Sequence, residues 1–482
     1  MAITSASGID AAPRKQTLSS NYIDFTSAAT EGWAQQYLPD LMAQEAEIYG
    51  KRTIAGFLAQ VGAEEASASD RVIWSEQGRL HLAYKATNED VSANIFTVTA
   101  DVDGNTIDGS AGNIHGMRVG DVVLVSNASL TLRGYVSAKA DATATILPYG
   151  AANFDTAGFS DSAGASAYRI LVIGSEFEKG TDGRSAANTP KFTSYSNKHI
   201  IMKDYYEVSG SDVSQVGWVE VAGEEGQSGY MWYLKAAGDT RARFSDYLEM
   251  TMLEAVTAHA DAGAIGGTDG GALQDGTEGL FAAIEARGHQ TTGVTGVNAA
   301  TDLAEFDAIL AAFDANGAIE ENMMFVNRGT SLAMDDMLAS MNSYGAGGTS
   351  YGVFDNSEDM ALNLGFSGFR RGSYDFYKSD FRYLNDKATR GGINDIAGSA
   401  AIRGVIIPAG VSSVYDQQLG KNLKRPFLHV RYRASQTDDR RMKTWVTGSV
   451  GATTSALDAM QVHYLSERCL IVQGANNFML MN

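Results

Sequence analysis

The stretch of sequence that decides the fold is GYMWYLKAAGDTRARFSDYLEMTMLEAVTAHA, residues 229–260. Its apolar residues recur at steps of three and four, the spacing that places side chains on one face of an α-helix. This apolar stripe consists of Tyr230, Tyr233, Leu234, Ala237, Phe244, Tyr247, Leu248, Thr251, Met252 and Ala255. Lys235, Asp239, Arg243 and Asp246 fall on the other face, at spacings where opposite charges support a solvated surface. The pattern therefore predicts one long amphipathic helix.

At about 1.5 Å per residue this helix would be roughly 50 Å long, so it needs an extended partner along its length. Periodicity alone is equally compatible with an ordinary long core helix or a coiled-coil arm. Extended segments do precede it. Residues 192–221 are a polar, glycine-marked stretch of strand, residues 71–84 predict an outgoing strand, and residues 176–206 predict its return. An isolated pair of strands buries too little apolar surface to be stable, so we expect another subunit to support this arm.

Short strand-like runs fill the segment between the outgoing and return strands. They cover residues 119–125, 132–139, 142–147 and 168–173, with Gly, Asn, Asp and Ser turns between them. Such a series is typical of a small barrel or sandwich. The sequence predicts a compact β domain over about residues 95–174, inserted at the tip of the arm.

A second folded region is predicted after the long helix. A glycine-rich link at residues 263–271 is followed by a helical stripe, a buried strand at residues 323–326, and a second helix at residues 331–341 with Leu332, Met337 and Leu338 facing inward. The stripe of the first helix is Leu303, Phe306, Ile309, Leu310 and Phe313. The chain from Ile402 onward is again rich in strands. At the other end, residues 1–30 have no core pattern and predict an arm, with short helical segments after it.

Composition excludes some classes of function. The chain has 482 residues, of which 57 are acidic and 37 basic, giving a formal net charge of −20. A general nucleic-acid binder needs Lys and Arg to neutralise phosphates, so this balance argues against one. The one cysteine, Cys469, lies in an apolar run and is interpreted as a buried small hydrophobe. No secretory signal and no apolar run of about 18 residues is recognisable, which predicts no membrane association.

The sequence shows no recognisable catalytic, cofactor-binding or metal-binding motif. The seven histidines are scattered without metal-ligand spacing, and the glycine-rich link reads as a hinge rather than a dinucleotide-binding turn. Residues 101–108 resemble the start of a calcium loop, but the turn at Asp103-Gly104 explains them without a metal. We predict no catalytic, cofactor-binding or metal-ligating residues, no cofactor, and no enzyme activity.

Basic residues gather near the C-terminus and could touch phosphate. They alternate with Phe427, Leu428, Val430 and Tyr432, as expected of a half-solvated strand. We therefore interpret them as structural, paired with acidic neighbours. The basic residues are Lys421, Lys424, Arg425, Arg431, Arg433, Arg440, Arg441 and Lys443.

Taken in order along the chain, these features resemble a major capsid protein of a tailed bacteriophage with the Hong Kong 97 fold. In that family an N-terminal arm, an extended hairpin loop, a long spine helix, an axial domain and returning C-terminal strands follow one another. Residues 321–327 with the helix after them resemble the axial-domain strand and helix. Four further segments resemble the closing strands: residues 362–366, 372–376, 383–386 and 402–408. Small β domains inserted in the extended loop occur in the family.

The resemblance implies an α+β fold of the Hong Kong 97 type with an inserted small β-barrel or sandwich. The implied parts are an N-terminal arm with short helices (1–63), an outgoing loop strand (64–94), the inserted domain (95–174), a return strand (175–209), a peripheral domain with the spine helix (210–261), an axial domain (262–399) and C-terminal strands that return to the peripheral domain (400–482). No motif allows the Lys-Asn cross-link of some members to be carried over.

The function implied is assembly of an icosahedral head shell from pentamers and hexamers in the host cytoplasm, with the protein ending up in the virion. Portal, scaffolding or decoration proteins are the implied partners, together with weak, non-specific contact to packaged DNA. Another virion structural protein, such as a portal or tail component, is the nearest alternative. An outer-membrane β-barrel is disfavoured by the long helix, and an enzyme with dispersed catalytic residues by the lack of any motif.

Overall fold

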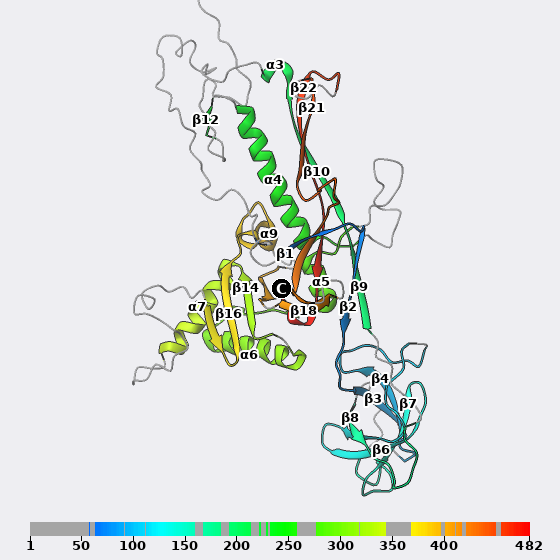
Figure 1. Cartoon of the computed structure of the whole chain (residues 1–482). Helices are drawn as coiled ribbons and strands as arrows, with labels where there is room; N and C mark the ends of the chain where they lie inside the picture. Colours follow the sequence, from blue (N-terminus) through cyan, green and yellow to red (C-terminus); the bar gives the residue numbers. More distant parts are fainter. Residues whose placement is uncertain are drawn as a thin grey trace, which may run out of the picture. The chain divides into compact units, whose positions relative to one another are not determined.

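Figure 1 gives the computed structural model of the chain. Three predictions lie outside the residues that it describes: the arm with its short helices, the link at residues 263–271, and the segment 362–366. The described residues are 57, 63–90, 92–110, 112–159, 167–184, 192–213, 221–222, 228–229, 232–257, 276–317, 319–343, 368–396, 401–409, 411–416, 421–449 and 455–482.

The chain divides into two compact units, one of Ile73–Ser196 and the other of Met1–Val72 with Asn197–Asn482. The boundary falls within β2 (Arg71–Gln77) and β9 (Phe192–Lys198), which pair with each other in a two-stranded sheet. Both strands are shorter than predicted. Residues 78–82 and 176–184 are not strand. In the second segment the Glu178 carbonyl accepts hydrogen bonds from Thr181, and Gly180 has φ +82°, so the chain turns there.

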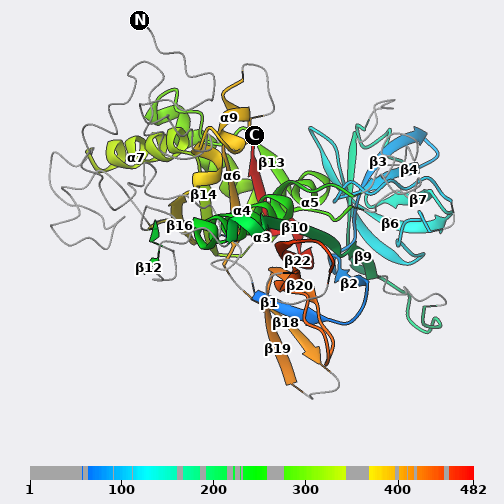
Figure 2. The ribbon, with the colours of Figure 1, turned by 90° about the horizontal axis from the view of Figure 1, so that it is seen from above.

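The predicted small β domain is a closed barrel, with strand order β3-β4-β7-β6-β5-β8 (Figure 2). It begins at Ala83 rather than near Ile95, because β3 pairs with both β4 and β8 and so closes the ring. Closure pairs every strand on two sides and removes the free edges that an open sheet exposes. The strands are β3 (Ala83–Asp90), β4 (Ile95–Asp101), β5 (Asp121–Ser126), β6 (Thr131–Lys139), β7 (Thr143–Pro148) and β8 (Tyr168–Ser175).

The barrel has its own hydrophobic core. Alternate residues of its strands point inward, as the period of two of a β-strand requires. The ring of Phe96 meets Phe154 and Tyr168 edge-on, with centroids 4.9 and 5.5 Å apart. The packing is tight at Gly134, where a Cβ atom would lie 2.4 Å from Cγ2 of Ile146.

The other unit contains a five-stranded sheet centred on one long strand, β22. β10 pairs antiparallel with one side of β22, β20 and β21 share its other side, and β1 pairs in parallel with β20. The sheet therefore joins strands from opposite ends of the sequence. The bounds are β1 (Ala63–Ser67), β10 (Ile200–Ser209), β20 (Leu428–Arg433), β21 (Lys443–Gly448) and β22 (Ala459–Val472).

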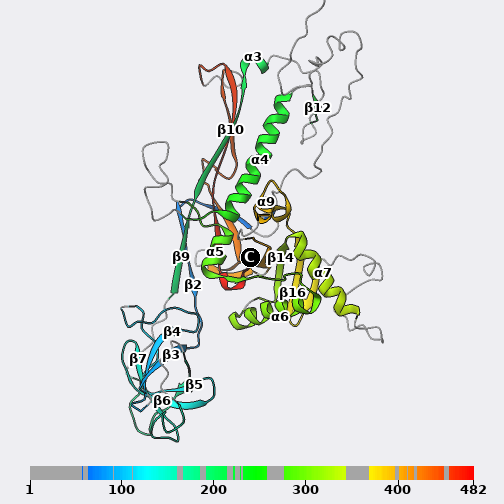
Figure 3. The same ribbon diagram turned by 180° about the vertical axis from the view of Figure 1, so that it is seen from behind.

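The predicted long helix is α4 (Trp232–Glu254), which runs beside β10 (Figure 3) and also packs on β22. Its 23 residues span about 35 Å at about 1.5 Å each. The helix ends at Glu254 rather than Ala260. The Ala255 carbonyl accepts a hydrogen bond of 2.8 Å from the Gly279 N–H, and a Cβ at Gly279 would lie 2.7 Å from the Ala255 nitrogen. This close backbone approach lies directly after the last residue of the helix.

The apolar stripe of α4 is confirmed at Phe244, Leu248 and Met252, which are buried. Tyr247 is wrong as a stripe residue, because 44% of it is exposed. At 100° per residue it lies on the border of the arc that Leu248 centres, where the neighbouring sheet no longer covers it. Tyr230 lies outside the described residues, as do the side chains of Tyr233 and Leu234.

A six-stranded mixed sheet follows, with strand order β13-β23-β17-β14-β16-β15. In the sequence, the predicted helix α6 precedes the central strand β14 and the predicted helix α7 follows it. Phe306, Phe313 and Met324 are buried in the core that these three elements share. The element bounds are β13 (His289–Thr291), α6 (Ala299–Asn316), β14 (Glu321–Val326), α7 (Arg328–Ser343), β15 (Gly368–Arg371), β16 (Tyr374–Asp380), β17 (Gly404–Pro408) and β23 (Met479–Met481).

Two predictions in this region need correction. Leu332 of α7 is 53% exposed rather than inward, because it lies about 160° around the helix from the buried Met334; Met337 and Leu338 are buried as predicted. Residues 383–386 do not form a closing strand. They belong mostly to the helix α8 (Arg382–Asn385), whose turn is closed by a hydrogen bond from the Asp386 N–H to the Arg382 carbonyl.

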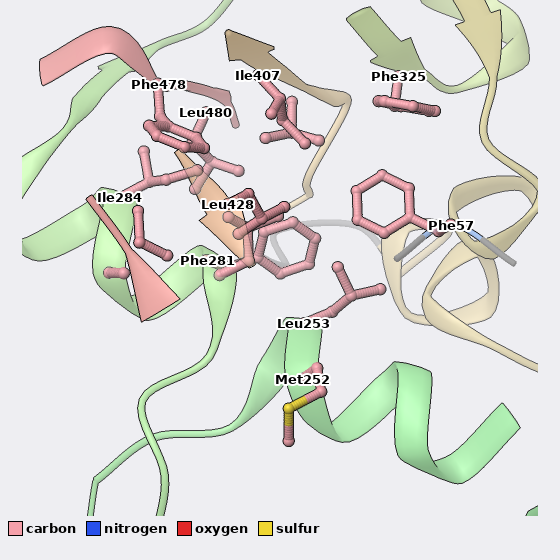
Figure 4. Packing of buried hydrophobic residues seen from close by; sticks show 14 of the residues in the cluster. Phe57, Met252, Leu253, Phe281, Ile284, Phe325, Ile407, Leu428, Phe478 and Leu480 are labelled. Atoms are coloured by element: carbon pink, nitrogen blue, oxygen red, sulfur yellow. The ribbon is translucent and has the colours of Figure 1, made fainter. Parts of the chain in front are cut away.

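A core of buried residues joins the end of α4 to strands of both sheets (Figure 4). It brings Met252 and Leu253 of α4 together with Phe281 of α5, Leu428 of β20 and Leu480 of β23. The two sheets of this unit are therefore packed as one body. The remaining elements are α3 (Gly210–Val213), β11 (Val221–Ala222), β12 (Ser228–Gly229), α5 (Leu280–Arg287), α9 (Arg390–Asn394), β18 (Val411–Asp416), β19 (Lys421–Pro426) and a 3-10 turn (Ala475–Asn477).

Candidate functional site: the five-stranded sheet and its anchors

We first consider metal sites and reactive nucleophiles in the described part of the chain. No group of three or more His, Cys, Asp and Glu residues within it could hold a metal ion. The Asp101 carboxylate accepts hydrogen bonds from the backbone and side-chain nitrogens of Asn105 at 2.8 and 2.7 Å, which makes this segment a turn. None of the described helices is both long and apolar enough to cross a membrane.

Cys469 is buried within β22, as the sequence predicts. Its Sγ lies 3.7 Å from Nε2 of His199. Burial raises the pKa of the Cys469 thiol to about 12, because the charged thiolate is poorly solvated there. The thiol therefore stays protonated near neutral pH and is a poor nucleophile.

The C-terminal basic residues pair with acids, which confirms their predicted structural role. Arg431 of β20 reaches Glu65 of β1, with 2.8 Å between Nη2 and Oε2. Arg441 pairs with Glu64, also on β1. Of the predicted set, the side chains of Lys421, Lys424 and Arg425 lie outside the description. The pairs fasten β1 to the sheet and leave these cations little charge for binding phosphate.

Glu467 and Arg468 of β22 form the buried centre of these pairs. Glu467 is only 4% exposed; its Oε2 lies 2.7 Å from Nε of Arg440 and its Oε1 3.7 Å from Nη1 of Arg433. Arg468 donates from Nε to Oγ of Ser466 at 2.9 Å. Burial lowers the pKa of the Arg468 guanidinium, and the nearby Glu64 carboxylate opposes that shift. A buried charge without its partner would cost several kcal/mol, so these residues depend on one another.

The two strands that lead out of this unit are anchored where they leave it. Asn197, which is buried, donates from Nδ2 to the carbonyls of Glu278 and Leu470 at 3.0 and 2.7 Å. Its Oδ1 accepts from the Glu278 N–H at 2.9 Å. His199 binds the Asp70 carbonyl through its backbone N–H and contacts it through Nδ1. These bonds fix the chain just before the start of β2 and at the end of β9.

α4 covers one face of the five-stranded sheet. Phe244 and Leu248 pack on Tyr464 of β22 and Met202 of β10. The hydroxyl of Tyr464 donates a hydrogen bond of 3.0 Å to the Ala237 carbonyl in α4. Residues of a strand point alternately to its two faces, so the neighbours of Tyr464 in β22 lie on the side away from the helix.

The last turn of α4 is tied to the region of the second sheet. The Tyr383 hydroxyl donates to Oε1 of Glu254 at 2.8 Å, and Nη1 of Arg390 donates to Oε2 at 2.9 Å. Burial and the Glu254 charge raise the pKa of the Tyr383 hydroxyl, so it stays a donor over the whole working range of a protein. Both carboxylate oxygens of Glu254 are thus occupied.

The sheet face away from α4 carries an aromatic ladder, which we call the open sheet face. Tyr205, His463 and Trp445 occupy directly opposite positions on β10, β22 and β21. The His463 ring stacks on both neighbours, with centroids 5.8 Å from Tyr205 and 5.2 Å from Trp445. Gln461 donates to Glu207 on the same face at 2.7 Å. Tyr205 is 56% exposed, so this ordered surface is open to a partner.

Sequence reasoning found the basic residues and Cys469. It missed Glu64, Asn197 and Glu254, because these residues are far in the sequence from the residues that they bind. The aromatic ladder was also missed, because its members come from three strands. The signal available was the alternation of apolar and polar residues at the start of β22, in Met460-Gln461-Val462-His463.

No family model matches the sequence, and no curated protein matches it. A solved structure from Mycobacterium phage Ogopogo is similar at 10% identity, over 94% of this chain and 99% of that one, with a TM-score of 0.39. One from Microbacterium phage Oxtober96 is similar at 9% identity over 94% and 99%, with a TM-score of 0.38. The capsid of an empty GTA particle is similar at 11% identity over 95% and 98%, with a TM-score of 0.37.

Proposed function

We propose that this chain is a major capsid protein of the Hong Kong 97 fold, which assembles through pentamers and hexamers into an icosahedral shell around viral DNA. The observation that carries the proposal is the order and pairing of the elements. An extended pair of strands precedes a long helix packed along a sheet, a second sheet with two helices follows, and the C-terminal strands β22 and β23 return to both sheets. Similar solved structures include capsids of a cyanophage, of bacteriophage PhiM1 and of a GTA particle, which agrees with the proposal.

The five-stranded sheet has features suited to contacts between subunits. Among the described residues β10 has a strand partner on one side only, so it is an edge strand of this sheet. The open sheet face adds ordered, partly exposed aromatic rings. Contacts of this kind, repeated around symmetry axes by identical subunits, are heterologous and close into shells.

We assign the domain boundaries as follows: an arm at 1–63, the extended loop at 64–82 and 176–209 with the barrel between its two parts, a peripheral domain at 210–261 joined by strands from 400–482, and an axial domain at 262–399. The loop and the arm would each lie across a neighbouring subunit. Portal, scaffolding and decoration proteins are the partners to expect for such a shell. The net charge of −20 suits a wall that repels packaged DNA rather than binding it.

We also propose that the barrel is an insertion in the extended loop. Its first and last strands are neighbours: Ala83 pairs with Leu171, and the Val172 N–H donates to the Leu82 carbonyl at 3.0 Å. Adjacent ends are typical of inserted domains, whose removal leaves the host fold intact. Replacing residues 83–171 with a short Gly/Ser linker should therefore leave a soluble subunit with the five-stranded sheet formed. Aggregation of this variant would show that the barrel belongs to the main core.

Electron microscopy of the purified full-length protein tests the capsid function. Icosahedral shells or isolated pentamers and hexamers are expected. Rings or tubes would favour a portal or tail component, and dispersed monomers at high concentration would contradict assembly. Deleting residues 1–30 should leave a folded subunit, judged by circular dichroism, that no longer forms stable shells. Normal shells from this truncated chain would rule out the proposed role of the arm.

A further inference from the structure

A cavity of about 550 Å³ lies on the outer surface of the barrel. The residues that matter in its lining are Tyr135, Leu147, Tyr149, Glu176, Phe177 and Glu178. This volume is within the roughly 300–1,000 Å³ of ligand-binding clefts in proteins. The proposed shell function uses none of these residues.

The barrel strands themselves form the floor of this cavity. Tyr135 of β6 and Leu147 of β7 lie directly opposite each other in the register. Their neighbours in sequence, Val136 and Ile146, are fully buried in the barrel core, so Tyr135 and Leu147 point outward. Leu147 is 45% exposed, which leaves an apolar surface next to the tyrosine ring.

The wall of the cavity is an aromatic ring held in a fixed place. Phe177 packs against Gly120, where an added Cβ would lie 2.9 Å from Cζ of the ring and where φ is +90°. The guanidinium of Arg184 lies over the same ring, 5.7 Å from its centroid. Arg184 is in turn paired with the buried Asp121, with 2.5 Å between Nη2 and Oδ1. The protein thus already places one guanidinium against Phe177.

The rim of the cavity is acidic. The Tyr149 hydroxyl donates a hydrogen bond to Glu176, and that bond raises the pKa of Tyr149, so the hydroxyl remains a donor. Glu178 also lines the cavity and is exposed, so it adds a second acidic residue to the lining. The lining contains no Lys or Arg. Aromatic faces next to carboxylates attract a cation, through the ring quadrupole and through charge-assisted hydrogen bonds.

We propose that this cavity is a docking site for a segment of a partner protein that inserts an arginine side chain. Arginine fits better than lysine because its planar guanidinium stacks on aromatic rings and donates to a carboxylate through two N–H groups. The cavity volume exceeds what one side chain fills, so apolar neighbours of that arginine would lie on Leu147. The site does not depend on the shell function, since a soluble subunit presents it equally.

Saturation-transfer NMR on the full-length protein tests this site with defined probes. The probes are the blocked peptide Gly-Gly-Arg-Gly-Gly and its versions with lysine or citrulline in place of arginine. We expect transfer to the arginine side chain, weaker transfer to lysine and none to citrulline, which has the shape of arginine without its charge. Glu178→Gln and Tyr149→Ala should each weaken arginine-peptide binding about three- to thirtyfold.

Asp155→Asn is the matched control, because it removes one exposed carboxylate of the same unit outside the cavity. It should leave binding unchanged, whereas Glu178→Lys should abolish it. Equal loss in Asp155→Asn and Glu178→Gln would mean general attraction to an acidic protein and would overturn the proposal. So would equal binding of the citrulline peptide, or binding of neutral sugars in place of the arginine peptide.

Discussion

The barrel and the five-stranded sheet bury the apolar faces of their strands in different ways. The barrel closes on itself, so each strand has two partners and the aromatic residues Phe96, Phe154 and Tyr168 fill its centre. The five-stranded sheet is covered by α4 on one face, while Tyr205 and Trp445 line the other. The comparison teaches that the barrel pairs and buries its strands among themselves, whereas the sheet is complete only with a helix and, on our proposal, a neighbouring subunit.

The largest effect is expected where the open sheet depends on its helix. Phe244→Ala removes a fully buried ring from the contact with Tyr464 and should lower the free energy of unfolding by about 3–5 kcal/mol. Urea denaturation followed by circular dichroism measures this. Arg243→Ala, next to it on the exposed face, should change it by less than about 0.5 kcal/mol. Equal effects would mean that the helix does not support the sheet.

The anchor of the return strand should come next. Asn197→Ala leaves the Glu278 N–H and the Glu278 and Leu470 carbonyls without their side-chain partner in a buried site, which should cost about 2–4 kcal/mol. Asn476→Ala is the control, because it loses one exposed hydrogen bond to Asn316 and should cost about 1 kcal/mol or less. Similar values for both variants would show that the strand is held by other contacts.

A smaller and more local effect is expected in the barrel. Gly134→Ala places a Cβ 2.4 Å from Cγ2 of Ile146, and this overpacking should cost about 1–3 kcal/mol. Gly174→Ala on β8 meets no atom within 4 Å and serves as the control. If the barrel is self-contained, hydrogen exchange should rise in β3 to β8 and stay unchanged in β22. Increased exchange in both would show that the two units unfold together.

The smallest effect concerns Cys469 in the middle of β22. Its pKa of about 12 in the folded state is above the ordinary value, so the neutral thiol contributes stability that is complete below about pH 9 and is lost as pH rises toward 12. Relative to Cys469→Ala, the wild type should lose about 1 kcal/mol between pH 9 and pH 10. Iodoacetamide at pH 8 should leave the native thiol unmodified. Rapid alkylation at that pH would show that β22 opens easily.

Local patterns in the sequence were sufficient for much of the fold. The three-and-four spacing of Phe244, Leu248 and Met252 predicted α4, and a run of short strands predicted the barrel, because both patterns are read within one segment. One element had the wrong type, because residues 383–386 were predicted as a strand and belong mostly to the helix α8. The other errors came at the borders of elements. Tyr247 lies at the border of the buried arc of α4, and Leu332 lies outside the buried arc of α7. α4 ends close to Gly279, and the spacing of residues within the helix cannot predict a contact with such a distant residue.

The sequence by itself determined the elements, their order, and the burial of Cys469, since these follow from periodicity and composition along the chain. Only the tertiary structure decided which distant residues meet. Glu254 with Tyr383, Asn197 with Leu470, and the ladder of Tyr205, His463 and Trp445 each join segments that are far apart in sequence. The physical reason is that strand partners and buried hydrogen bonds are selected by the packing of the whole chain, and a single segment carries no record of the surface that it will face.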